Sequence, residues 1–149
     1  MHLRTVSFLA LVFTALALIP SGAHLLALPN KIGLPEDQYF IVQGIYRGWA
    51  LFGFILFPAL LLDLVLAFLL RGERAALLQA LAACVCLAAT LAIFFSFTDP
   101  ANVATDNWTV FPANWAALRT QWEYSHAVNA VLTFVAFCLV VRASLPPRA

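Results

Sequence analysis

Long apolar stretches alternate with shorter polar connections along the whole chain. The apolar stretches cover residues 6–28, 40–70, 75–97 and 118–141, and the longer connections are residues 29–39 and 98–117. A helix needs about 20 residues to cross the hydrocarbon core of a bilayer, and every stretch is at least that long. The pattern predicts an all-α fold: an integral membrane four-helix bundle that forms a single transmembrane domain over residues 1–149.

The composition agrees with a protein whose surroundings are largely lipid. Hydrophobic residues make up 64% of the chain and charged residues 10%, whereas soluble domains average about 45–50% apolar and about 25% charged residues. We therefore expect a lipid bilayer as the main partner. The formal net charge of +1 does not provide the basic surface that binds nucleic acid, so we expect no nucleic-acid partner.

The basic residues separate into two groups, one at each end of the predicted helices. One end would carry Arg4, Arg71, Arg74, Arg142 and Arg148, and the other end Lys31 and Arg119. Short cytoplasmic segments of membrane proteins are enriched in lysine and arginine. We therefore expect four spans in a bacterial inner (plasma) membrane, with the N- and C-termini cytoplasmic and both longer connections outside.

The last predicted helix carries a polar stripe on one face. Arg119, Glu123, His126, Asn129 and Thr133 follow one another at steps of four, three, three and four residues. This spacing places side chains on the same side of a helix. Ionisable groups inside a membrane are costly unless they face other protein, so the stripe is a candidate functional site.

Polar residues from other helices are expected at the same depth as this stripe. We counted about 20 residues, at about 1.5 Å per residue, from the cytoplasmic end of each helix. The four ionisable residues expected in one layer near the outer surface are His24, Arg47, Glu123 and His126. Tyr46 precedes Arg47 in the chain, and Asn129 lies just below the layer.

Four interpretations of this layer stay open. Two histidines and one carboxylate, His24, Glu123 and His126, are the ligands of mononuclear non-haem iron sites, so a single non-haem metal ion is one candidate cofactor. Haem held between the two histidines is a second. A cofactor-free histidine base, with an arginine that holds the resulting anion, is a third. In the fourth, Arg119 and Arg47 both pair with Glu123 and the layer only holds the helices together.

Large aromatic residues gather in the connection 98–117 and at the start of the helix that follows it. Trp108, Trp115 and Trp122 are the tryptophans of this region, and a flexible linker would not need them. Either the connection folds over the bundle as a cap, or its tryptophans form the aromatic belt found at lipid–water interfaces. A cap above the polar layer would favour a flat, hydrophobic, oxidisable substrate.

The same region resembles a known family. The pattern Thr98-x-Pro100-x-Asn102, then Asn114-Trp115-x-x-Leu118-Arg119-x-x-Trp122-Glu123-x-x-His126-Ala127, is similar to the anthrone-oxygenase-like family of small four-helix membrane proteins. The resemblance covers mainly residues 90–140. It implies a four-helix layout and, by analogy with the fungal members, oxidation of anthrones to anthraquinones by molecular oxygen. The site residues that it implies are Asn102, Trp115, Arg119, Trp122, Glu123 and His126.

These features together predict an oxidoreductase-like protein. It would bind or act on a small hydrophobic aromatic or quinone-like molecule in a pocket near the outer membrane surface. We expect His126 as the base, Glu123 as its orienting partner, and Arg47 or Arg119 as the group that stabilises the anion. The side chains expected to bind the substrate are Tyr46, Asn102, Trp115, Trp122 and Asn129.

Two other functions stay open. The chain could be a non-catalytic subunit of a membrane complex or form a homo-oligomer, because Gly44 and Gly48 form a small-xxx-small pair that lets another helix approach closely. A metal- or haem-binding electron-transfer protein is the other alternative. Asp63 lies apart from the polar layer, toward the cytoplasmic side, where Arg71 or Arg74 could reach it.

Overall fold

The computed structural model describes residues 2–145, of which 85% are helical and none is in a strand. The helices are α1 (Leu3–Lys31), α2 (Glu36–Gln43), α3 (Gly53–Leu69), α4 (Arg74–Ile93), α5 (Asp99–Ala104) and α6 (Trp115–Ser144). The short helical turns between them are η1 (Gly44–Tyr46), η2 (Trp49–Phe52) and the π-helical turn η3 (Phe94–Thr98). The all-α prediction is therefore confirmed for the described residues.

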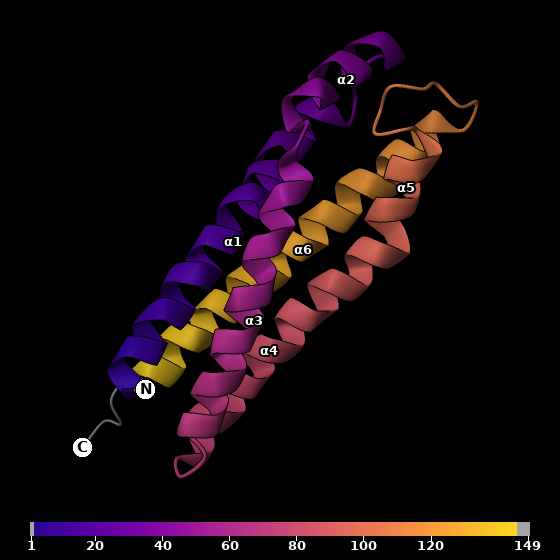
Figure 1. Cartoon of the computed structure of the whole chain (residues 1–149). Helices are drawn as coiled ribbons and strands as arrows, with labels where there is room; N and C mark the ends of the chain where they lie inside the picture. The colour runs from indigo at the N-terminus through magenta and orange to yellow at the C-terminus, as the bar shows by residue number, and fades with distance from the viewer. Residues whose placement is uncertain (1, 146–149) are drawn as a thin grey trace.

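Four long helices pack side by side as a bundle, in the cyclic order α1, α3, α4, α6 (Figure 1). The start of α1, the end of α6 and the α3–α4 turn lie at one end, which we call the terminal end. Helices α2 and α5 and the loop before α6 lie at the opposite end, the loop end. Each connection thus joins antiparallel neighbours in the bundle.

The outer surface of the bundle suits a lipid environment. Four helical segments are long and apolar enough to cross a bilayer: Leu3–Lys31, Trp49–Leu69, Arg74–Ala104 and Trp115–Ser144. Large apolar side chains such as Leu26, Phe54 and Phe134 are exposed on the outside of these segments, where water would be unfavourable. These features confirm an apolar helical bundle with four potential spans. Which end faces the cytoplasm stays a prediction.

The core at the terminal end is packed mainly from small side chains. Its fully buried residues include Ala10, Ala59, Ala80, Ala83 and Ala136, with Leu66 and Val140 between them. Alanine lets helix backbones approach closely, and this close packing is a main source of helix association where the surroundings are as apolar as the core.

The segment predicted as one helix over 40–70 is interrupted. Arg47 has extended backbone angles (φ −58°, ψ 123°), and Gly48 adopts the left-handed region at φ 84°. Glycine has no Cβ and takes this conformation without strain. A Cβ added at Gly44 or Gly48 would meet no atom within 4 Å, so the two glycines do not form a helix contact within the chain. Gly48 instead allows the turn between α2 and α3.

Both longer connections are shorter than predicted. Helix α1 continues to Lys31, and α2 begins at Glu36, within the predicted connection 29–39. Helix α4 continues through η3 and α5 to Ala104, and Pro100 lies in the first turn of α5, directly after the π-helical turn. The irregular part of the second connection is therefore confined to residues 105–114.

Candidate functional site

A buried ion pair at the loop end links α1 to α6. Glu123 is 1% exposed, and its Oε1 lies 2.9 Å from Nζ of Lys31, which is 3% exposed. The same oxygen accepts a hydrogen bond of 2.9 Å from the hydroxyl of Tyr39 on α2, and Gln43 Nε2 donates to that hydroxyl at 2.6 Å. Three separate segments therefore meet at one carboxylate.

Aromatic rings surround the Lys31 ammonium. Its Nζ lies 4.4 Å from the ring centroid of Tyr46 and 4.9 Å from that of Trp122. A cation over an aromatic face is attracted by the negative charge density of that face, most strongly when water is excluded. The rings and Glu123 together compensate the loss of hydration of a buried ammonium.

Two histidines from different helices stack beside this ion pair. The rings of His24 on α1 and His126 on α6 are 3.9 Å apart with an angle of 22° between their planes. His24 also contacts the rings of Tyr46 at 4.3 Å and Trp122 at 5.0 Å. Its Nδ1 is buried and has no hydrogen-bond partner among residues 2–145. We call this the histidine pair, and the pair together with Lys31, Tyr39, Tyr46, Trp122 and Glu123 the loop-end cluster.

The π-helical turn η3 brings α5 onto α6. Thr98 and Ser125 share a hydrogen bond of 2.8 Å between their hydroxyls, and Gln121 Nε2 donates to the carbonyl of Phe97 at 2.8 Å. One turn later, Asn102 Oδ1 accepts a hydrogen bond of 2.8 Å from Trp122 Nε1. The side chain of Trp122 is thereby fixed against the histidine pair.

The irregular loop covers the cluster with a buried tryptophan. Asp106, Asn107 and Trp108 all have positive φ angles, of 45°, 54° and 65°. Asp and Asn tolerate this region, whereas a bulky side chain adopts it only when its surroundings fix it. Trp108 donates its backbone N–H to Thr105 Oγ1 at 3.1 Å, and its ring lies 5.1 Å from Tyr39 and 5.8 Å from Trp122. The loop thus acts as an aromatic cap.

Arg119 and Trp115 lie on α6 and pack against α2 and the residues just before it. Arg119 Nη1 donates to the carbonyl of Leu34 at 2.7 Å, and its guanidinium lies 4.7 Å from the ring of Trp115 and 5.4 Å from that of Tyr39. Arg119 does not pair with Glu123, because Lys31 occupies that position. Its role in the structure is to fix the chain between α1 and α2.

Tyr39 acts as a neutral hydrogen-bond donor. Burial raises the pKa of its phenol well above the ordinary value of 10.0, and the neighbouring Glu123 carboxylate raises it further. A phenol that keeps its proton can donate it to the carboxylate at any physiological pH. The hydrogen bond from Tyr39 to Glu123 is therefore maintained across that range.

Most residues predicted from the sequence meet at this site, but Arg47 does not. His24, Tyr46, Asn102, Trp122, Glu123 and His126 all belong to the cluster or contact it directly. Arg47 is exposed and forms no ion pair in the part of the chain that the structure describes, because the turn at Gly48 separates it from the bundle core. Asn129 is buried on α6, and its Oδ1 lacks a partner among the described residues.

The sequence reasoning missed Lys31, Tyr39 and Gln43. The buried positions of α1 include Thr14, Ala17, His24 and Lys31, and Lys31 follows His24 by seven residues. This spacing on a helix indicates a shared face, so the pattern could have identified Lys31. No comparable signal exists for Tyr39 or Gln43, because their positions depend on how α2 folds back over the bundle.

The geometry does not assemble the predicted metal ligands. No group of three or more His, Cys, Asp or Glu side chains among residues 2–145 is placed to hold a metal ion. Glu123 Oε1 is bound by Lys31 and Tyr39, and the rings of His24 and His126 stack on each other. A separation of 3.9 Å between the rings also leaves no space for a haem between them.

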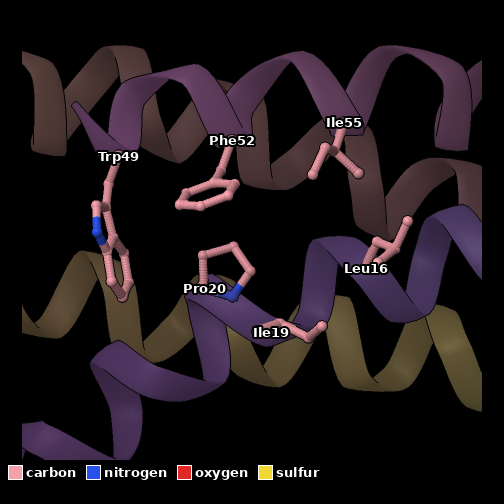
Figure 2. Close-up of a pocket in the computed structure, with 6 residues that line it drawn as sticks. All are labelled: Leu16, Ile19, Pro20, Trp49, Phe52 and Ile55. Carbon is pink, nitrogen blue, oxygen red and sulfur yellow. The ribbon is translucent and has the colours of Figure 1, made fainter.

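An apolar groove of about 180 Å³ lies next to the histidine pair, between α1 and the η2–α3 segment (Figure 2). Leu16, Ile19 and Pro20 form one wall, and Trp49, Phe52 and Ile55 form the other. Trp49 also contacts the ring of His24, at 5.5 Å. Trp49 therefore borders both the groove and the loop-end cluster.

Comparisons with protein-family models, with curated proteins and with solved structures give no match for this chain. The resemblance to the anthrone-oxygenase-like family accordingly stays a prediction from the motif residues.

Proposed function

We propose that the loop-end cluster binds a small, hydrophobic aromatic or quinone-like molecule and removes a proton from it, as one step of an oxidoreductase-like reaction. The observation that carries this proposal is the histidine pair: a buried imidazole with an unpartnered Nδ1, set among aromatic rings and beside a buried ammonium. A base, a cation and flat apolar surfaces are the groups needed to ionise such a molecule.

Each part of the cluster has a distinct task in this proposal. The histidine pair accepts the proton, with His126 behind His24 as its stacking partner. Lys31 stabilises the anion, a task that the sequence suggested for Arg47 or Arg119. Glu123 and Tyr39 hold Lys31 in position, and the faces of Tyr46 and Trp122 bind the ring system of the substrate.

Access from the bilayer is proposed along the groove of Figure 2. Its six lining residues are all apolar, as a route from lipid requires. The aromatic rings of the cluster contact one another, so a substrate must displace at least one of them. Trp49 borders the groove and also contacts His24, and it directly follows Gly48, the left-handed residue of the turn. We propose that rotation of Trp49 admits the substrate.

The chemistry after proton removal follows the family resemblance. For an anthrone, molecular oxygen would oxidise the ring methylene to a carbonyl and release water, which yields the anthraquinone. If the terminal end faces the cytoplasm, as the basic residues predict, the cluster lies near the outer surface of a bacterial inner membrane. Reporter proteins fused to the C-terminus would test that orientation.

Turnover of dihydroxyanthrone by the purified protein tests the proposal. The substitution His24→Asn should lower the rate of quinone formation by about a hundredfold or more, the usual contribution of a general base, because it removes the imidazole whose Nδ1 is unpartnered. His2→Asn is the matched control, because His2 is exposed at the other end of the bundle, and it should leave the rate unchanged. Equal rates for the wild type and His24→Asn, both folded, would refute the proposed role of the pair.

A structural role is the second candidate, favoured by one observation. The Lys31–Glu123–Tyr39 contacts connect α1, α2 and α6, so they stabilise the loop end whether or not a ligand binds. The chain would then serve as a non-catalytic subunit of a membrane complex or as part of a homo-oligomer. Under this alternative, substitutions in the cluster would change stability or assembly, and no quinone or anthrone would bind to the purified protein.

A further inference from the structure

A second buried ionisable group lies far from the loop-end cluster. Asp63 on α3 is 0% exposed, and neither of its carboxyl oxygens has a hydrogen-bond partner among the described residues. It precedes the last residue of α3 by six positions, about 9 Å along the helix axis. Asp63 therefore belongs to the terminal end, where the core is otherwise built from small apolar side chains.

No cation compensates this carboxyl. The sequence suggested Arg71 or Arg74 as its partner, and this expectation is wrong. Arg71 Nη1 donates to the carbonyl of Phe68 at 3.0 Å, its guanidinium lies 4.3 Å from the Phe68 ring, and the residue is exposed. Arg74 is exposed as well, and Asp63 forms no ion pair within residues 2–145. The short α3–α4 turn leaves both arginines outside the core.

The buried residues of the helices around Asp63 are almost all apolar at the terminal end. Buried residues at the terminal end comprise Val6, Ala10 and Thr14 on α1, Ala80, Ala83, Cys84 and Leu87 on α4, and Thr133, Ala136, Val140 and Ala143 on α6. Among them the Cys84 thiol is the one titratable group. A charged carboxylate without a partner is very unfavourable in such surroundings, whereas a protonated carboxyl loses far less on leaving water.

We propose that Asp63 is a proton-binding site inside the bundle, and that its carboxyl group carries the proton at neutral pH. The contrast with Glu123 supports this assignment, since Glu123 is equally buried but has Lys31 Nζ 2.9 Å from its Oε1. Intramembrane carboxyls that exchange a proton are the working groups of proton relays. Asp63 thus gives the chain a protonatable group at the end opposite its histidine pair.

Infrared spectroscopy of the full-length protein in detergent tests this proposal. The wild type at neutral pH should show the carbonyl stretch of a protonated carboxylic acid, and this band should shift in heavy water. Asp63→Asn should remove the band. Asp37→Asn is the control, because Asp37 is exposed on α2, and it should retain the band.

The conservative variant Asp63→Glu covers the case in which Asp63→Asn does not fold. It keeps an acid at the site but changes its surroundings, so the band should move in frequency and remain present. The proposal is overturned if the folded wild type shows no carboxylic-acid band. It is equally overturned if the band persists in Asp63→Asn or keeps its frequency in Asp63→Glu.

Discussion

At the terminal end the four long helices meet through alanine and leucine, whereas at the loop end the segments meet through aromatic rings and a buried ion pair. Small side chains fill space and need no particular partner. The ionic and aromatic groups of the loop end depend on specific partners on other helices. The difference separates the part of the molecule that holds the bundle together from the part that can carry chemistry.

Breaking the ion pair of the loop end should have the largest effect on stability. Glu123→Gln leaves the Lys31 ammonium buried without its counter-charge, and removal of one partner of a buried pair costs about 3–5 kcal/mol. The double substitution Lys31→Met with Glu123→Gln removes both charges and should recover most of this loss. Unfolding in detergent measures both effects.

Glu73→Gln provides the control for this comparison, because Glu73 is exposed in the α3–α4 turn. Substitution there should change the free energy of unfolding by less than about 0.5 kcal/mol. If Glu123→Gln is no more destabilising than Glu73→Gln, the loop end does not depend on its ion pair.

Removal of the Tyr39 hydroxyl should have an intermediate effect. Tyr39→Phe deletes a hydrogen bond to a charged group, which contributes about 1.5–3 kcal/mol, and leaves Gln43 Nε2 without its acceptor. Tyr124→Phe, at a side chain that is 54% exposed, is the matched control and should be close to neutral. Equal unfolding free energies for the two variants would contradict the network.

The same tyrosine predicts a dependence of stability on pH. Its pKa is raised in the folded state above the ordinary value of 10.0, so the unfolded chain releases the proton first as the pH rises. The stabilisation is fully present below about pH 10 and decreases above it. Unfolding measured on both sides of this pH should show a steeper loss for the wild type than for Tyr39→Phe, and parallel curves would contradict the burial of the phenol.

The smallest effect is expected at the turn between α2 and α3. Gly48→Ala forces a side chain into the left-handed region, at a cost of about 1–2 kcal/mol. Gly44→Ala is the control, because Gly44 has right-handed helical angles (φ −58°, ψ −24°) and open space around it, so its stability should be unchanged or slightly higher. Thermal unfolding of the two variants tests this, and a reversed order would contradict the interruption at Gly48.

The terminal end could be predicted from the sequence more completely than the loop end. The hydropathy pattern alone indicates four apolar helices, and the spacing of Glu123 and His126, with the depth of His24, locates the candidate site. Apolar residues lie on both sides of the turn at Gly48, so the pattern predicted a continuous helix and placed Arg47 in the cluster. Lys31 was assigned to a connection because α1 is longer than its apolar stretch. The first error concerns where the chain turns and the second concerns where a helix ends. Hydropathy encodes neither.

The central claim is that the loop-end cluster is a ligand site and not only a structural contact. The most direct measurement is the binding of a hydroxynaphthoquinone, an anion at neutral pH, to the wild type and to the Lys31→Met, Glu123→Gln double variant, followed by tryptophan fluorescence. The double variant should be folded but should bind about tenfold to a hundredfold more weakly, because loss of a charged hydrogen bond costs about 1.5–3 kcal/mol. Binding of equal strength to both proteins, or to neither, would contradict the account.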